Sequence, residues 1–296
     1  MDEKPINPGF GAIVKEVQGP LDDIRPLPIC HVTTPGGFER MTRDMKLVAQ
    51  EESDEKKDRR GKKNKEKPYG KERILYFFYG KASYIFNGEA LPVYLVGSPV
   101  AIIFELEALT EESKEIHRML PFDSGGFHRY KISSGFTKED FTIYSPTEEI
   151  LRKYVKLMYG TNDNYLNLRV KTPPDDQTSK SQVFNEIINI HNEANIGKAE
   201  FGEQGVTIEL QFKDVEIKFK PKVILVPFAY SSRFNKNGTT KRLQDMGVAV
   251  VPYFDREKTL TPMDEFAFMK EKVYNVVSQM VNPQAMVNPQ TGGISA

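Results

Sequence analysis

Cysteine is nearly absent from this sequence: Cys30 stands alone among 296 residues. A single cysteine excludes an internal disulfide framework and a multi-cysteine zinc site. Long apolar runs are absent too, and none approaches the roughly 18 residues that a membrane-spanning helix needs. The first ten residues, MDEKPINPGF, are charged and proline-rich, unlike a signal peptide with a basic and then an apolar part. We therefore expect a cytoplasmic protein without a membrane partner.

An excess of charge of one sign is missing as well. The 41 lysine and arginine residues equal the 41 aspartate and glutamate residues, so the formal net charge is zero. This balance excludes a broadly basic nucleic-acid-binding coat, but it leaves room for a local basic patch. Hydrophobic residues make up 39% of the chain and charged residues 28%, which is ordinary for a globular protein.

Several well-known catalytic motifs do not occur. The sequence contains no Gly-x-Ser-x-Gly elbow, no phosphate loop that ends in Gly-Lys-Ser/Thr, no His-Glu-x-x-His and no Gly-x-Gly-x-x-Gly. The four histidines, His31, His117, His128 and His191, lie far apart without metal-ligand spacing, so we expect no bound metal. Cys30 adjoins His31, but neighbours on a strand point to opposite faces, which disfavours a Cys-His dyad.

Composition divides the chain into one domain and its flanking segments. Residues 1–24 predict an irregular lead-in, and residues 25–281 predict a single α+β domain of catalytic type. Residues 51–67 carry 14 charged side chains among 17 residues and predict a flexible loop. A binding role for the basic part of this loop, residues 56–65, is the alternative. Residues 282–296 predict a disordered tail.

Hydrophobic periodicity predicts a mixture of helices and strands, which is the pattern of an α+β fold. Apolar residues recur at helical spacing in residues 38–49, 148–158, 182–192 and 262–280. A capping box at residues 145–148 is expected to start the second of these helices, with Pro146 as its first residue. Strands are expected at residues 27–34, 73–84, 100–106, 206–212, 215–219 and 222–230.

Three clusters contain the residue types that chemistry requires. On the first strand, His31 and Thr33 share one face because strand residues alternate. The segment 77–84 (FFYGKASY) places aromatic residues around a glycine and Lys81. On a late strand, Glu209 lies among apolar neighbours. Each cluster has a purely structural alternative: a hydrogen-bonded histidine, an aromatic core and a glutamate that faces water.

In this order along the chain, the clusters resemble the ADP-ribosyltransferase superfamily, and within it the toxin-type, DarT-like enzymes that modify nucleic acid. In those enzymes an early strand carries His-x-Thr or His-x-Ser, a second segment is aromatic and contains a cation, and a late strand carries the catalytic glutamate. The resemblance covers about 100 residues in scattered pieces. It implies an α+β fold with a split antiparallel β-sheet core and flanking helices, and it implies NAD as substrate.

The resemblance assigns the catalytic role to Glu209, whose carboxylate would lie beneath the ribose and stabilise an oxocarbenium-like transition state. It assigns binding of the adenosine-side or the nicotinamide-side ribose, and of the carboxamide region of NAD, to His31 and Thr33. No metal is implied.

Aromatic and cationic residues of the second cluster receive the remaining roles. Tyr79 or Tyr84 would stack on the nicotinamide ring, and Lys81 would neutralise the pyrophosphate or orient the acceptor. DarT-like enzymes carry an arginine where this chain has Lys81. Lysine is a point charge and lacks the planar fork of arginine, so this position departs from the family pattern.

The function implied by the resemblance is NAD-dependent ADP-ribosyl transfer by a toxin or phage-defence effector. Its acceptor would be a nucleic acid or a protein, and its regulator an antitoxin or similar partner. The alternatives are a non-enzymatic interaction protein and a nucleic-acid-binding protein or nuclease, which would use the charged loop and the aromatic segment. Residues 121–127 (PFDSGGF) are expected to form a loop turn without a link to NAD.

Overall fold

The structure is a computed structural model, which describes most of the chain. The described residues are 9–48, 72–83, 99–111, 115–130, 132, 135–171, 181–195, 206–213, 216–253 and 262–282. The predicted loop at 51–67 and the predicted tail from residue 283 onward lie outside them. Within the predicted irregular lead-in, the structure differs from the expectation and forms helix α1 (Phe10–Lys15), because Phe10, Ile13 and Val14 are buried in the core.

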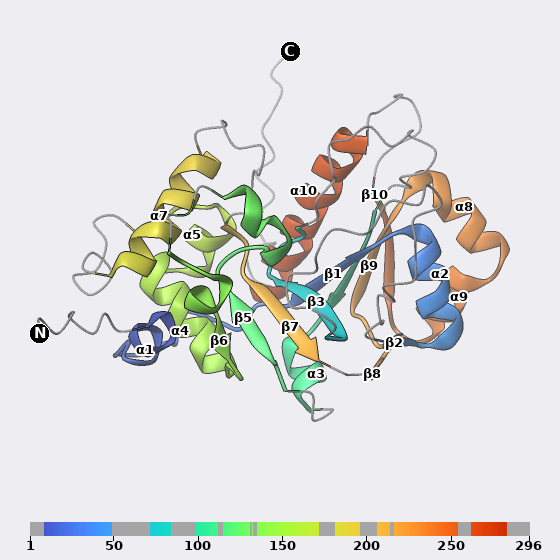
Figure 1. Cartoon of the computed structure of the whole chain (residues 1–296). Helices are drawn as coiled ribbons and strands as arrows, with labels where there is room; N and C mark the ends of the chain where they lie inside the picture. Colours follow the sequence, from blue (N-terminus) through green and yellow to red (C-terminus); the bar gives the residue numbers. More distant parts are fainter. Residues whose placement is uncertain are drawn as a thin grey trace, which may run out of the picture.

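Eight strands form the central sheet (Figure 1). In spatial order they are β10 (Ala249–Tyr253), β9 (Val223–Pro227), β4 (Val100–Phe104), β1 (Ile29–Thr33), β3 (Ile74–Tyr79), β7 (Glu209–Lys213), β5 (Arg118–Leu120) and β6 (Ile143–Tyr144). Strands β9 and β10 are parallel, and the neighbours from β9 to β6 pair antiparallel. Strands β2 (Lys46–Val48) and β8 (Glu216–Lys218) form a second, two-stranded sheet. The predicted α+β class is confirmed.

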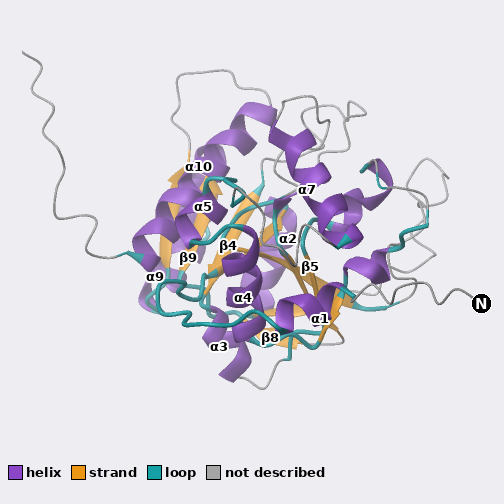
Figure 2. Ribbon diagram, turned by 90° about the vertical axis from the view of Figure 1, so that its left-hand side faces the viewer, coloured by secondary structure: helices purple, strands orange, loops and turns teal. Residues whose placement is uncertain are grey.

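Helices gather at the two ends of the central sheet (Figure 1). Near β5 and β6 lie α1, α4 (Glu148–Met158), α5 (Asn162–Leu166) and α7 (Gln182–Asn195). Near β2 lie α2 (Pro35–Asp44), α8 (Phe228–Lys236) and α9 (Thr239–Asp245). Between the groups, α10 (Pro262–Val281) contacts β9 and β10, and α3 (Leu106–Glu111) follows β4. Two 3-10 helices, η1 (Ser124–Arg129) and η2 (Lys138–Phe141), lie in the chain between β5 and β6. After a quarter turn, helices lie in front of the strands (Figure 2).

Aromatic rings from three strands pack together on one face of the sheet. Phe77 of β3 meets Phe104 of β4 and Phe212 of β7 edge to face, with ring centroids 5.8 and 5.3 Å apart. All three side chains are buried. On each strand, alternate side chains point to the same face of the sheet, and these three rings point to the same face and form a common core there.

Element boundaries differ from the sequence expectation by a few residues, and each difference has a local cause. Helix α2 begins at Pro35 rather than at residue 38, because the Thr34 side chain caps its first turn. Helix α4 is capped by Thr147, so the expected role of Pro146 as its first residue is wrong. Strand β9 ends at Pro227, where α8 starts.

The central strand β1 is paired unequally on its two sides. It pairs with β4 over five residue pairs but with β3 over two, the second of which joins Cys30 to Phe78. One residue further on, the His31 Nδ1 lies 2.9 Å from the Tyr76 carbonyl oxygen of β3. The imidazole therefore occupies the seam at which β1 and β3 begin to part, as a split sheet requires.

Candidate functional site

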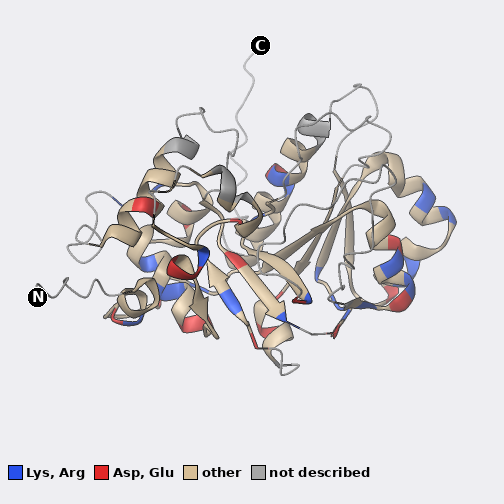
Figure 3. Cartoon of the chain, viewed as in Figure 1, with Lys and Arg blue, Asp and Glu red and all other residues tan. Residues whose placement is uncertain are grey.

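Glu209 is the first residue of β7, and it is buried with 1% of its surface exposed. Leu210 and Phe212 lie on the aromatic core face, so strand alternation places Glu209 and Gln211 together on the opposite face. Both of these polar side chains are buried as well. The alternative in which Glu209 simply faces water does not hold. In Figure 3, acidic and basic colours interrupt the otherwise tan strands β7 and β5.

Directly before Glu209, the Tyr165 hydroxyl replaces one backbone hydrogen bond between the two chain segments. The Tyr79 N–H donates to the Ile208 carbonyl oxygen at 3.0 Å, as in a regular antiparallel pair. The return bond is replaced, because the Ile208 N–H donates to the Tyr165 hydroxyl at 3.2 Å, and this hydroxyl donates to the Tyr79 carbonyl at 2.7 Å. Helix α5 thereby fixes the point at which β7 starts, and with it the position of Glu209.

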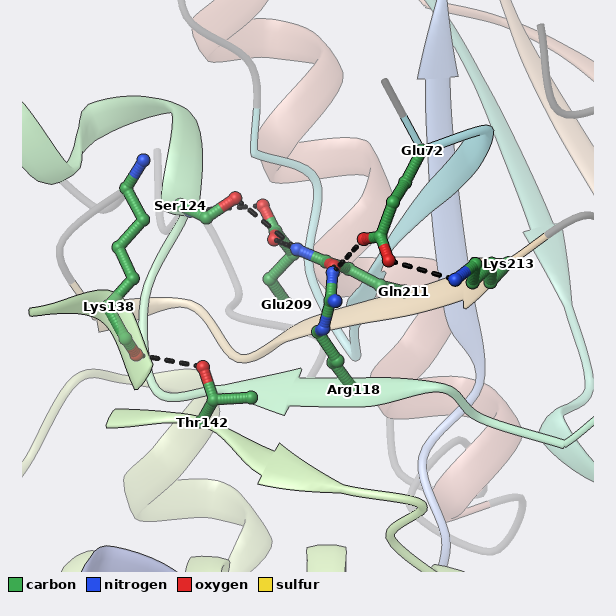
Figure 4. A network of polar contacts seen from close by, with 8 residues as sticks. All are labelled: Glu72, Arg118, Ser124, Lys138, Thr142, Glu209, Gln211 and Lys213. Atoms are coloured by element: carbon green, nitrogen blue, oxygen red, sulfur yellow. Dashed lines mark hydrogen bonds and ion pairs between the residues drawn. The ribbon is translucent and has the colours of Figure 1, made fainter. Parts of the chain in front are cut away.

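Both carboxylate oxygens of Glu209 accept hydrogen bonds (Figure 4). The Ser124 backbone N–H donates to Oε2 at 3.1 Å, and the Gln211 Nε2 donates to Oε1 at 2.7 Å. The same Gln211 nitrogen lies 3.4 Å from the Ser124 hydroxyl oxygen. Two N–H donors that point at one carboxylate favour its charged form.

Burial and a second acid act in the opposite direction. Desolvation by burial, followed by the charge of Asp123, raises the pKa of Glu209 to about 8, although the hydrogen bonds from Gln211 and Ser124 lower it. Asp123 is itself buried, and its carboxylate accepts from the Gly125 N–H at 2.8 Å. A buried carboxylic acid with a pKa near neutrality contributes nothing to stability when ionised, and such groups concentrate at functional sites.

A charged chain continues from Gln211 toward the surface. Arg118 of β5 pairs with Glu72, and the Lys213 Nζ donates to the other oxygen of Glu72 at 2.9 Å (Figure 4). Burial opposes the ionisation of Glu72, but the hydrogen bonds from Arg118 and Lys213 outweigh it and hold the pKa of this carboxyl below its usual value. The Arg118 Nη1 also lies 3.5 Å from Gln211 Oε1.

The segment after β5, which the sequence predicted to be an ordinary turn, forms one wall of the site. The Asp123 side chain caps η1, and the Tyr130 hydroxyl donates to the Asp123 carbonyl at 3.0 Å. Phe122 packs against Tyr130 with ring centroids 5.1 Å apart. A half-buried ring, Phe127, lies beneath the Lys138 ammonium at 5.5 Å. Partial burial lowers the pKa of Lys138, while the negative charge of Glu209 counts among the effects that raise it.

The structure does not bring His31 and Thr33 together with Glu209, because they lie on the opposite face of the sheet. Cys30 shares a row of the sheet with Phe78 and Glu209, so alternation gives His31 the opposite face and its ring reaches the seam instead. Burial lowers the pKa of His31, which keeps the imidazole neutral, and its contact with a carbonyl oxygen places the proton on Nδ1. A Cβ at Gly37 would lie 2.3 Å from the Thr33 hydroxyl oxygen, so only glycine leaves room for this hydroxyl.

Tyr79 and Lys81 are gathered around Tyr165 rather than around Glu209. Tyr79 is fully buried, and its hydroxyl oxygen accepts from the Leu27 N–H at 3.0 Å, so the structure places this ring in the core. The Lys81 ammonium lies 4.9 Å from the Tyr165 ring centroid and lines an open pocket of about 340 Å³, to which α10 also contributes. Tyr84 lies outside the described residues.

Sequence reasoning singled out Glu209 but not most of the residues that surround it. Asp123, Ser124 and Arg118 are more than 80 residues away from it in sequence, and no local pattern joins them. Among the residues that the structure describes, no group of three or more His, Cys, Asp and Glu side chains could hold a metal ion. A search of the same residues for a helix of the length and hydropathy of a membrane span found none.

Comparisons with known proteins find similar solved structures but no match in sequence. No protein-family model matches the chain, and no curated protein matches it in sequence. Among solved structures, it is similar to Thermus sp. 2.9 DarT in complex with carba-NAD+ and with NAD+, each with a TM-score of 0.37, and in complex with ADP-ribosylated ssDNA, with a TM-score of 0.39. The identities are 13–14%, and the matches cover 77% of this chain and 94–96% of the DarT chains. These are structures of the group that the sequence motifs resemble.

Proposed function

We propose that the chain is an NAD-dependent ADP-ribosyltransferase in which the Glu209 carboxylate stabilises positive charge on the nicotinamide ribose of NAD. One observation carries this proposal: a buried carboxylate, held at both oxygens by N–H donors, in an environment that disfavours its charge. Such a carboxylate stabilises a neighbouring cation strongly, because opposite charges attract more in the low-dielectric surroundings that burial creates.

The reaction follows from this placement. The bond between ribose C1′ and the nicotinamide nitrogen breaks, and its electron pair leaves with nicotinamide, which becomes neutral. The ribose passes through an oxocarbenium-like state that faces the Glu209 carboxylate. A nucleophile of the acceptor forms the new bond to C1′ and loses its proton. The products are ADP-ribosylated acceptor, nicotinamide and a proton, with NAD consumed as substrate.

His31 supplies the proposed second contact to NAD. Since the Tyr76 carbonyl oxygen can only accept, its 2.9 Å contact with Nδ1 favours a proton on Nδ1 and leaves Nε2 as an acceptor that suits a ribose hydroxyl. Because His31 lies on the face of the sheet opposite Glu209, this contact is proposed at the end of the β1–β3 pairing and not along the face that carries Glu209. Thr33 continues this surface toward α2. Tyr79 and Lys81 enter the proposal as packing that holds the end of β3.

The acceptor is proposed to be a nucleic acid first and a protein second. Phe127 offers a half-buried aromatic ring, and Lys138 offers a cation over it, close enough to Glu209 for their charges to interact. A ring and a cation together fit a nucleobase and its phosphate. The toxin-type resemblance of the motifs extends the proposal to a toxin or phage-defence effector with an antitoxin or regulatory partner.

The test uses the purified full chain, NAD labelled on its adenylate part, and single-stranded DNA, double-stranded DNA, RNA or protein as acceptor. We expect nicotinamide release and label transferred to one acceptor class in equal amounts. Glu209→Gln should lose most of this activity. The matched control is Glu216→Gln, because Glu216 is an exposed strand glutamate that pairs with Lys46, and the rate of this control should stay within a few-fold of the unmodified chain. A chain that neither binds nor consumes NAD with any acceptor contradicts the proposal and favours the non-enzymatic interaction protein.

A further inference from the structure

The Gln211 side chain lies between a cation and the Glu209 carboxylate. Its Nε2 donates to Glu209 Oε1 at 2.7 Å, and its Oε1 faces the Arg118 Nη1 at 3.5 Å (Figure 4). An amide has donors on one side and an acceptor on the other, whereas a guanidinium can only donate. Arg118 therefore determines which end of the amide faces Glu209.

Arg118 is itself fixed in place. It is buried on β5, directly opposite Gln211 in the strand register, and it pairs with the Glu72 carboxylate. Its guanidinium also lies 5.6 Å from the centroid of the Tyr144 ring. Lys213 gives Glu72 a second cationic partner, so the charge of Glu72 is matched even without Arg118. Neutralising Glu72 is thus an incomplete explanation for a buried arginine at this position.

We propose that Arg118 is a positioning residue that acts through Gln211, by holding the amide so that its N–H group donates to the Glu209 carboxylate. Only the catalytic consequence rests on the function proposed above. Without the guanidinium, the amide is free to turn and to present its oxygen to Glu209. A carboxylate opposite a carbonyl oxygen is repelled, so Glu209 would then remain protonated at a pH at which the reaction needs its charge.

The primary test measures the ionisation of Glu209 without any substrate. Thermal midpoints are recorded between pH 5 and pH 10 for a variant and for the same variant with Glu209→Gln, and the difference isolates the titration of Glu209. In Arg118→Met we expect the titration midpoint to move upward by about one pH unit. Lys213→Met is the matched control. It removes a cation from the same Glu72, but among the described residues the Lys213 ammonium pairs with Glu72 and not with Gln211 or Glu209, so the midpoint should stay in place.

A double variant tests whether the effect passes through the amide. Gln211→Met removes the donor and should raise the midpoint by a similar amount. Adding Arg118→Met to Gln211→Met should then change nothing further, because the two residues act in series. Should Arg118→Met fail to fold, Arg118→Lys serves in its place, since it keeps the charge but loses the fork that reaches both Glu72 and Gln211.

The outcomes separate this proposal from the proposed function. An upward shift in Arg118→Met, absent in Lys213→Met and not additive with Gln211→Met, supports the positioning role even if NAD is never consumed. An unchanged midpoint in a folded Arg118 variant, or shifts that add in the double variant, overturns it. With an active enzyme, the acid limb of the kcat/KM profile for nicotinamide release should move by the same amount, which is about a tenfold loss per unit at a fixed pH below the midpoint.

Discussion

The two faces of strand β7 are equally buried and opposite in chemistry. Leu210 and Phe212 on one face are fully enclosed by apolar neighbours, and Phe212 meets the Phe77 ring edge to face. Glu209 and Gln211 on the other face are just as inaccessible, but they bury polar atoms. Apolar burial stabilises a fold directly, whereas a buried acid does so only while it is neutral or well paired. The apolar face of the strand thus stabilises the fold, and the polar face holds a buried carboxylate that can ionise.

The largest expected effect on stability lies on the apolar face. Phe212→Ala removes a fully buried ring that Phe77 contacts, and it should cost about 3–5 kcal/mol of unfolding free energy. Urea titration followed by circular dichroism measures this loss. A loss below about 1 kcal/mol would contradict the view that the apolar face of β7 stabilises the fold.

A pH-dependent stability difference should mark the polar face. Because the pKa of Glu209 is raised in the folded state to about 8 from an ordinary value of 4.5, the folded chain binds the proton more tightly than the unfolded chain. Its contribution is fully present below pH 4.5 and is lost as the pH rises through about 8. Glu209→Gln cannot ionise, so its thermal midpoint minus that of the unmodified chain should increase between pH 5 and pH 9. A flat difference would show that Glu209 titrates normally.

The same titration should govern catalysis with the opposite sign. If the charged carboxylate is the active form, kcat/KM for nicotinamide release rises with pH, by about tenfold per unit below a midpoint near 8, and then levels off. Stability and activity therefore change in opposite directions over one pH range. Initial rates at low NAD concentration measure the profile, and a rate that falls over this range would assign catalysis to the protonated acid instead.

The smallest effect is expected at the outer end of the polar face. Lys213 pairs with Glu72 at 2.9 Å, but 37% of its side chain is exposed. Removing it in Lys213→Met should change the unfolding free energy by about 0–1 kcal/mol, because solvent screens pairs of this kind. Urea titration checks this value, and a loss as large as that of Phe212→Ala would make the outer pair part of the core.

Local pattern was sufficient for the strand that carries Glu209 but not for the surroundings of this residue. The alternation at residues 206–212 predicted β7, and helical spacing predicted α4 and α7. The Ser124 N–H, however, meets Glu209 across 85 residues, and only the completed sheet brings them together. Asp123 followed by Ser124 and two glycines is a turn pattern that many unrelated loops share. Its contact with a buried acid is invisible in one sequence.

Aromatic residues illustrate the second limit of sequence reasoning. An aromatic residue on an apolar strand suits a ligand surface and a core equally well. Tyr79 or Tyr84 was predicted to stack on nicotinamide, yet the Tyr79 ring is buried and packs near Tyr165, with centroids 6.2 Å apart. Helices α8 and α9 and strand β10 were missed for a different reason: residues 228–253 show neither a clear helical nor a clear strand period of hydrophobic residues.

The central claim is that the negative charge of Glu209 acts on the transition state and not on bound NAD. Glu209→Gln keeps the size of the side chain but removes the charge. Steady-state nicotinamide release and equilibrium NAD binding, measured on the same preparation at pH 9, separate the two effects. We predict a fall in turnover of at least ~10²–10³-fold with the Kd for NAD changed by no more than a few-fold. Turnover within tenfold of the unmodified chain, or a loss of binding as large as the loss of turnover, would contradict the account.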